Sequence, residues 1–343
     1  MPLSIETETT IYEIEFRSIQ LQITGLCNMG CAHCRAANEA KRDLPLKDAV
    51  NVIWFAHDHR ADDYFDVVLS GGEPLLHKQF DDLLIAIKGF NPDRVMLTTN
   101  GYYLTQEAID RIFDVNFKSF CVSMSLDFAT EDEHDAFRSF RGAYQGTIKA
   151  RKLLADAGIE YSMHMSVPPT SLDVVESVVQ EVAAHGGKRA SFSPVHKIGR
   201  AHNTLVSHRE HLHALIAKVK ELQLKYPLTL SMSDPLFDIC GSYVDDKESY
   251  GGCAAGIHSF SVSANGDIYP CIMLPILVTN VCDKTPDEIA RGYQTSSVMQ
   301  SLVTREFGGK CGKCKYLYSC GGCRARAERE LGNFLAEDPF CII

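Results

Sequence analysis

The sequence contains Ile19-Gln20-Leu21-Gln22-Ile23-Thr24 and, two residues later, Cys27-Asn28-Met29-Gly30-Cys31-Ala32-His33-Cys34. The first segment alternates apolar and polar side chains, which predicts a strand, so the three thiols open the loop that follows it. Three thiolates at this spacing can hold three irons of a cubane cluster and leave the fourth iron open. Structural zinc is the alternative, but zinc requires four ligands and commonly uses C-x2-C pairs. His33 is a less favoured fourth ligand, because its ring would have to fold back between two ligating neighbours.

Composition limits the classes of protein that this chain can belong to. It has 343 residues, 45% hydrophobic and 23% charged, which is ordinary for a globular protein with one large and one smaller domain. The formal charge of -10 argues against nucleic acid as a partner. We expect no membrane partner, because no apolar run is long enough to cross a bilayer. Thirteen cysteines without a secretory signal predict a cytoplasmic protein that uses them as metal ligands.

Short apolar runs alternate with amphipathic stretches as far as Tyr226. The predicted strands are Ile19–Thr24, Val67–Ser70, Val95–Thr99, Phe120–Leu126, Tyr161–Val167 and Ala190–Pro194. The predicted helices are Leu46–Ala56, Phe80–Ile87, Gln106–Phe113, Gly146–Ala157, Leu172–Ala184 and Arg209–Leu224. This order predicts an α/β fold with parallel strands, in the form of a partial (β/α)6 barrel over residues 1–226. Beyond Pro227 helical periodicity fades and cysteines cluster, so we expect a second, metal-stabilised domain over residues 227–343.

Polar motifs follow several of the predicted strands. They are Gly71-Gly72-Glu73-Pro74, Thr98-Thr99-Asn100-Gly101 and the segment Ser123–Asp127. In barrels of parallel strands, chemistry is located at the carboxyl ends of the strands. The first two motifs have an alternative interpretation as ordinary turn chemistry.

The cysteine run, followed one strand later by the Gly-Gly-Glu-Pro motif, resembles the radical S-adenosylmethionine (SAM) superfamily. The resemblance implies an enzyme that splits SAM at a 4Fe–4S cluster and abstracts hydrogen with the 5′-deoxyadenosyl radical. Reduced flavodoxin or ferredoxin would supply the electron. The resemblance assigns cofactor contacts as follows: Gly71, Gly72, Glu73 and Pro74 to the SAM amino group, Asn100 to the nucleoside or methionine end, Ser123, Ser125 and Asp127 to the ribose, Arg138 (or Arg141) to the carboxylate, and Pro194 and Val195 to the adenine.

The C-terminal cysteines resemble the SPASM extension of this superfamily, which holds one or two auxiliary 4Fe–4S clusters. By this resemblance one cluster is bound by Cys240, Cys253, Cys271 and Cys323, and the second by Cys311, Cys314, Cys320 and Cys341. The chain departs from the usual pattern in having C-x2-C at Cys320 and Cys323. Two zinc ribbons are the alternative. Cys121 and Cys282 are left without a ligand role.

The substrate is less well defined by the sequence. The segments Cys31–Ala36, Cys320–Ala327 and Leu335–Cys341 resemble the haem-pathway branch, and Ile272 stands where sulfatase maturases have an Asp. Only 18 residues precede the first predicted strand, too few for a peptide-recognition domain. We therefore expect a small carboxylate-bearing substrate, either a tetrapyrrole or a sugar-acid nucleoside, with Lys197, Arg200 or Arg35 holding its carboxylate. A ribosomal-peptide maturase and a non-enzymatic electron carrier are the alternatives. The sequence assigns no catalytic acid or base.

Overall fold

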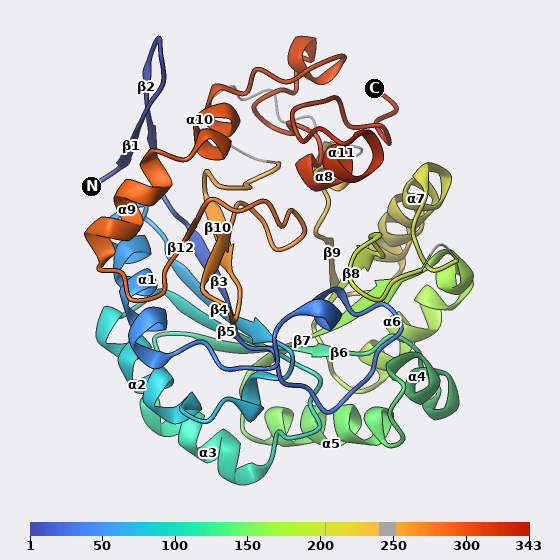
Figure 1. The fold of residues 1–343 in the computed structure, drawn as a ribbon. Coiled ribbons are helices and arrows are strands. Elements are labelled where there is room, and N and C mark those ends of the chain that lie inside the picture. Colours follow the sequence, from blue (N-terminus) through green and yellow to red (C-terminus); the bar gives the residue numbers. More distant parts are fainter. Residues whose placement is uncertain (203, 240–251) are drawn as a thin grey trace.

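The structure is a computed structural model that describes residues 1–202, 204–239 and 252–343. Cys240, an expected cluster ligand, lies outside the described residues. Within them, a curved sheet has the strand order β12-β11-β10-β3-β4-β5-β6-β7-β8-β9 (Figure 1). Its strands are β3 (Ser18–Thr24), β4 (Asp66–Gly71), β5 (Arg94–Thr99), β6 (Phe120–Ser125), β7 (Glu160–Val167), β8 (Arg189–Pro194), β9 (Thr229–Met232), β10 (Ser259–Val262), β11 (Asp267–Tyr269) and β12 (Thr279–Asn280).

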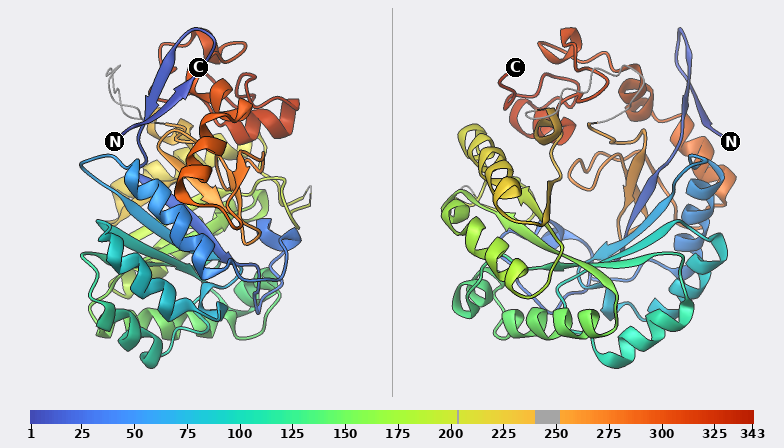
Figure 2. Two further views of the ribbon diagram at one scale, coloured as in Figure 1. Left: turned by 60° about the vertical axis from the view of Figure 1, so that its left-hand side comes forward. Right: turned by 180° about the vertical axis from the view of Figure 1, so that it is seen from behind.

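Helices connect the successive parallel strands and cover the convex side of the sheet (Figures 1 and 2). They are α1 (Leu46–Asp58), α2 (Phe80–Phe90), α3 (Gln106–Val115), α4 (Glu131–Arg138), α5 (Ala143–Asp156), α6 (Val175–Ala184) and α7 (Arg209–Lys225). Short 3-10 turns occupy Arg35–Asn38, Pro74–Leu76, Pro169–Val174 and Cys311–Lys313. The six expected strand–helix units are therefore confirmed, with ends that differ by a few residues.

The two faces of the sheet differ in chemistry because side chains alternate along each strand. Leu21, Leu69 and Leu97 are fully buried and belong to the same core as the helices. The residues between them on the other face are mostly small and polar, and many are half-buried: Gln22, Ser70, Thr98, Ser123, Ser125, His164, Ser191 and Ser193. The concave side of the barrel is therefore polar.

The region after Pro227 contains more regular structure than its sequence suggested. It forms α8 (Pro235–Ile239), α9 (Pro286–Gln294), α10 (Ser297–Thr304) and α11 (Arg324–Leu331). A capping box begins α9, in which Thr285 Oγ1 accepts from the Glu288 amide and the Glu288 carboxylate accepts from the Thr285 amide at 2.8 Å. The expected loss of helical structure here is wrong. Moreover, β10 pairs in parallel with β3, so the sheet continues past the expected domain boundary at residue 226.

A hairpin of β1 (Leu3–Glu6) and β2 (Ile11–Ile14) precedes the barrel. The sequence analysis placed no strand there. Leu3, Ile5 and Ile14 are buried in the common core, while the alternate residues are exposed. Among the described helices, none combines the length and the apolar character that a membrane crossing requires.

Four aromatic rings join the C-terminal region to the barrel. Phe16, just before β3, contacts Phe55 of α1, Phe260 of β10 and Tyr293 of α9, with ring centroids 5.4, 4.8 and 5.5 Å apart. Phe260 and Tyr293 are themselves 5.6 Å apart. The Tyr293 hydroxyl donates to the Gly256 carbonyl oxygen at 2.7 Å, which satisfies the polar end of a fully buried ring.

We predict that Phe260→Ala destabilises the protein by about 3–5 kcal/mol, because it leaves a cavity between β10, α1 and α9. The measurement is anaerobic urea unfolding followed by circular dichroism. Phe113→Ala is the matched control, since this ring on α3 is 66% exposed and its loss should change the midpoint little. Equal midpoints for the two variants would contradict this account of the core.

Candidate functional site

Cys27, Cys31 and Cys34, called the triplet below, lie in the loop that leaves the carboxyl end of β3. All three are free thiols; Cys31 is buried and the other two are half-buried. The Met29 amide donates to Cys27 Sγ at 3.4 Å. Burial raises the pKa of Cys27 and of Cys31, and a thiolate at Cys34 would raise both further. The loop thus gathers three thiols at the open end of the barrel.

The Gly71-Gly72 segment packs directly against the triplet loop. The Gly72 amide donates to the Thr24 carbonyl oxygen at 2.7 Å, and the Glu73 amide donates to the Leu26 carbonyl oxygen at 2.7 Å. A Cβ atom at Gly72 would lie 2.1 Å from the Leu26 carbonyl oxygen and 3.1 Å from Cys27 Cβ. Only glycine therefore allows this approach. Pro74, which is buried, begins the short 3-10 turn that follows.

Glu73 is completely buried beneath these two loops. Its carboxylate accepts from Thr99 Oγ1 at 2.7 Å and from the Asn100 amide at 2.8 Å. Burial raises the pKa of Glu73 despite these bonds. Asn100 in turn donates from Nδ2 to Asn28 Oδ1 at 2.9 Å, inside the triplet loop. Glu73 therefore positions Asn100 and the triplet loop, and its expected contact with the SAM amino group stays a prediction.

Asp127 and Arg138 form a buried ion pair beside Cys31. Arg138 Nε and Nη2 both lie 2.5 Å from Asp127 Oδ2, and Arg138 Nη1 donates to Cys31 Sγ at 3.8 Å. The Ser166 amide donates to the other carboxylate oxygen at 2.9 Å. Burial alone would raise the pKa of Asp127, but the Arg138 guanidinium outweighs it and the pKa lies below its usual value. Both side chains are thus engaged with protein, which gives them a bracing role around Cys31.

The remaining expected SAM contacts lie on or near the inner face. Ser123 and Ser125 are half-buried on β6, whereas Pro194 and Val195 are buried at the end of β8. The Val195 amide donates to Ser207 Oγ at 3.0 Å. Arg141, the alternative to Arg138, is exposed between α4 and α5.

The structure adds two histidines that the sequence analysis did not select. His164 lies on β7 between the inner-face serines of β6 and β8, with Nδ1 2.9 Å from Ser191 Oγ. His134 accepts the Asp127 amide at Nδ1, 3.1 Å away, and burial lowers its pKa to about 4, so it is neutral at pH 7. The alternation of Tyr161–Val167 already indicated that His164 shares a face with Ser162 and Ser166.

Cys253, Cys271 and Cys323, called the three-cysteine group, are half-buried thiols in the region after Pro227. Thiolate charge on Cys253 acts on both Cys271 and Cys323, and burial raises the pKa of these two, that of Cys323 to about 12. The Met273 amide donates to Cys271 Sγ at 3.4 Å. Their expected fourth partner, Cys240, lies outside the described residues.

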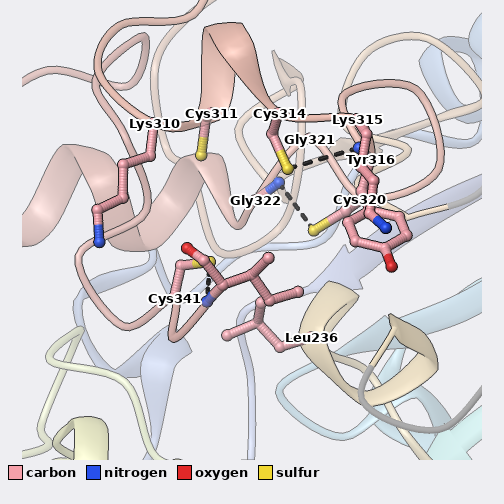
Figure 3. Close-up of a pocket in the computed structure, with 11 residues that line it drawn as sticks. Leu236, Lys310, Cys311, Cys314, Lys315, Tyr316, Cys320, Gly321, Gly322 and Cys341 are labelled. Atoms are coloured by element: carbon pink, nitrogen blue, oxygen red, sulfur yellow. Dashed lines mark hydrogen bonds between the residues drawn. The ribbon is translucent and has the colours of Figure 1, made fainter.

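Cys311, Cys314, Cys320 and Cys341, called the four-cysteine group, line one cavity of about 280 Å³ (Figure 3). Backbone amides of Tyr316, Gly322 and Ile343 donate to Cys314, Cys320 and Cys341 at 3.4, 3.2 and 3.4 Å. Glycines are required here, because Gly321 and Gly322 both have positive φ, and a Cβ at Gly322 would lie 3.1 Å from Cys311 Sγ. Cys121, buried in β6, and Cys282, which donates to the Asn265 carbonyl oxygen, stand apart from these groups.

The donor chemistry of the three groups fits iron–sulfur clusters. Each group offers thiols, which are soft donors that favour such clusters, and backbone amides point at several of the sulfurs. Within the described ranges, no three His, Cys, Asp or Glu side chains converge at the spacing of a single metal ion. A cubane cluster holds its thiolates at separate corners and does not require that convergence.

We predict that Gly72→Ala reduces the iron bound at the triplet, because the added methyl group would displace Leu26 and Cys27. The measurement is iron content and cluster absorbance after anaerobic reconstitution, made in a variant whose C-terminal cysteines are replaced by Ser. Gly89→Ala on α2 is the control, since its Cβ would meet no atom within 4 Å. Full iron occupancy in Gly72→Ala would show that the loop tolerates the displacement.

Comparisons with known proteins identify the family. Residues 21–182 match the family model of the radical SAM superfamily. The chain is 27% identical over 344 residues to AdoMet-dependent heme synthase of Methanosarcina barkeri, covering 95% of this chain and 96% of the relative. It is 26% identical over 310 residues to the subtilosin biosynthesis protein AlbA of Bacillus subtilis, covering 88% and 66% of the two chains.

A solved structure shares the fold. Streptococcus suis SuiB bound to S-adenosylmethionine superposes with a TM-score of 0.76 at 20% identity, covering 96% of this chain and 78% of SuiB. The triplet loop, the parallel barrel and the family match agree with one another. Residues 21–182 are a radical SAM domain, and the protein is an enzyme that uses SAM and iron–sulfur clusters.

Proposed function

We propose that this enzyme abstracts hydrogen next to a carboxylate-bearing carbon of a tetrapyrrole side chain, followed by loss of CO2 or by oxidation at the adjacent carbon, with the one remaining electron accepted by an auxiliary iron–sulfur cluster. Bound at the triplet, a 4Fe–4S cluster and SAM would supply the 5′-deoxyadenosyl radical that removes the hydrogen atom. The observation that carries the choice of substrate is the position of Arg35, a cation between the triplet and the three-cysteine group.

Arg35 follows Cys34 directly and turns towards the inner face of the barrel. Its Nη1 donates to Gln22 Oε1 at 3.0 Å, and its charge interacts with those of Cys34, Glu39 and Cys271. Burial lowers its pKa to about 10, so the guanidinium remains positive at pH 7. A half-buried cation at this place is suited to bind a carboxylate, because its charge is only partly screened by water.

The other two expected cations have different roles in the structure. Arg200 donates from Nη1 to the Cys31 carbonyl oxygen at 2.8 Å, and its amide donates to the Cys34 carbonyl oxygen at 2.9 Å. It therefore holds the triplet loop. Lys197 is exposed. Of the three, Arg35 is the best placed to hold a substrate carboxylate.

The relatives support a haem-related substrate. The chain aligns along nearly its whole length with a protein named AdoMet-dependent heme synthase. The similarity to AlbA, named for biosynthesis of the bacteriocin subtilosin, favours a second candidate, the modification of a ribosomal peptide. The electron-carrier alternative is set aside because the family assignment makes the protein an enzyme.

We further propose that the three-cysteine group, with Cys240, and the four-cysteine group hold two auxiliary clusters. On this proposal residues 1–226 form the SAM-binding core and residues 227–343 the auxiliary-cluster domain. The enzyme takes electrons from a reductant, for which we propose flavodoxin or ferredoxin. The cytoplasmic location expected from the cysteine content stays a prediction.

We predict that the anaerobically reconstituted protein binds about 12 irons per chain, four for each cubane, and cleaves SAM when reduced. The triple variant Cys27→Ala, Cys31→Ala, Cys34→Ala should lose SAM cleavage and retain about eight irons. The measurements are iron analysis and chromatography of 5′-deoxyadenosine. About four irons per chain in the wild type would contradict the auxiliary clusters.

We predict that Arg35→Gln raises KM about tenfold for Fe-coproporphyrin III, the compound in the name of a relative from Methanosarcina barkeri, because one ion pair to a propionate is lost. The measurement is mass spectrometry of product and of released CO2 in the presence of SAM and reductant. Arg111→Gln on α3 removes the same charge at the surface and is the control. A modified peptide, with no CO2 released from any tetrapyrrole acid, would show that the substrate class is wrong.

A further inference from the structure

Helix α11 begins directly after Cys323 and carries three arginines that lie in or near the protein interior. Arg324 and Arg326 are 1% and 2% exposed, and Arg329 is half-buried. Burial of a guanidinium is costly unless a negative charge or hydrogen-bond acceptors compensate it. Each of the three must therefore have a specific partner.

Arg324 points towards the four-cysteine group. Its Nη2 donates to Cys311 Sγ at 3.8 Å, and Nη1 donates to the carbonyl oxygens of Phe334 and Ala336 at 3.0 and 2.6 Å. The guanidinium also lies 4.1 Å from the centroid of the Phe307 ring. These contacts fix its orientation, and the described hydrogen bonds other than that to Cys311 go to neutral oxygens.

Arg329 lies on the side of the three-cysteine group. Its Nη2 donates to the carbonyl oxygen of Met273, the residue whose amide donates to Cys271 Sγ at 3.4 Å. Its charge acts on Cys323 and Cys271. Nη1 is buried and has no hydrogen-bond partner among the described residues. A buried N–H donor of a charged group in this position requires an acceptor, and a cluster bound to Cys271 and Cys323 would place anionic sulfur beside it.

Arg326, between them, serves a different purpose. It pairs with Asp234 at 2.6 Å and with Asp338 at 2.5 Å, and both carboxylates are buried. Asp338 also accepts from the Cys323 amide at 2.8 Å, and its own amide donates to Cys311 Sγ at 3.3 Å. Arg326 thus holds the backbone between the two cysteine groups, and its single positive charge is outweighed by those of two aspartates.

We propose that α11 sets the reduction potentials of both C-terminal clusters, with Arg324 acting on the cluster of the four-cysteine group and Arg329 on that of the three-cysteine group. The inference rests on the proposed function, because it requires that both groups hold clusters. Reduction adds a negative charge to a buried anionic cluster, and a nearby cation with N–H donors stabilises the reduced form. Both are positioning residues, since they act on the clusters and not on the substrate.

The test is a spectroelectrochemical titration, monitored by electron paramagnetic resonance, of the full chain with the triplet cysteines replaced by Ala. Arg324→Gln and Arg329→Gln should each lower the ratio of reduced to oxidised cluster, for one of the two clusters, about tenfold at fixed potential. This change is equivalent to about 59 mV for one electron. The two variants should affect different clusters, and Arg→Lys at each position should restore part of the shift. Arg291→Gln, an exposed position on α9, should change neither potential.

Iron content separates the outcomes. Wild-type potentials in both Gln variants, with iron retained, would overturn the proposal and leave the proposed function intact. If a Gln variant loses iron, the Lys variant at the same position tests the proposal instead. The proposal then requires that the reduction potential of the cluster in the Lys variant lie below that of the wild type. A Lys variant with full iron and an unchanged potential overturns the proposal as well. About four irons per chain in the wild type would overturn both the clusters and this inference.

Discussion

The close approach of the Gly71-Gly72 backbone to the triplet loop is the contact on which the site depends. Two backbone hydrogen bonds of 2.7 Å join these segments, and the contact leaves no room for a side chain at Gly72. The same approach brings Glu73 under the loop, where its carboxylate binds the Asn100 amide. Three consecutive strands of the barrel thereby fix one loop of cysteines.

Strand alternation then determines what surrounds this loop. The apolar residues of β3 to β8 face the helices and form the core, while Gln, Ser, Thr and His residues face the concave side. Small polar side chains leave room and supply hydrogen bonds, whereas large apolar side chains would fill the barrel. A polar concave face is consistent with a nucleoside cofactor, and Arg35 adds a positive charge on the side nearer the three-cysteine group.

Several buried arginine side chains lie next to the cysteines. Arg138 contacts Cys31 and is paired with Asp127, so much of its charge is already balanced. Arg324 contacts Cys311, while its other described hydrogen bonds go to neutral carbonyl oxygens. Isolated buried cations are costly, which makes anionic clusters the natural partners of α11. The same helix braces the region mechanically through Arg326.

The sequence by itself determined the order of strands and helices in the barrel and which three cysteines form the triplet. The alternation in Ile19–Thr24 and the helical spacing of apolar residues in Leu46–Ala56 follow from local backbone geometry, so both can be predicted from the sequence. The C-x3-C-x2-C motif is contiguous in the sequence, so it can be identified without knowledge of the fold. Cys311, Cys314, Cys320 and Cys341, which the resemblance grouped, line one cavity in the structure, while the ligand roles of the C-terminal cysteines stay a prediction.

Only the tertiary structure decided the roles of the buried charges and the extent of the sheet. The structure engages the carboxylates of Glu73 and Asp127 with Asn100 and Arg138, partners that the sequence did not assign to them, and their expected contacts with SAM stay predictions. Likewise β10 joins β3 across more than 200 residues, and Arg329 meets Met273 from another element. Contacts between residues far apart in the sequence produce no periodic sequence pattern, because the interacting groups meet only in the folded chain.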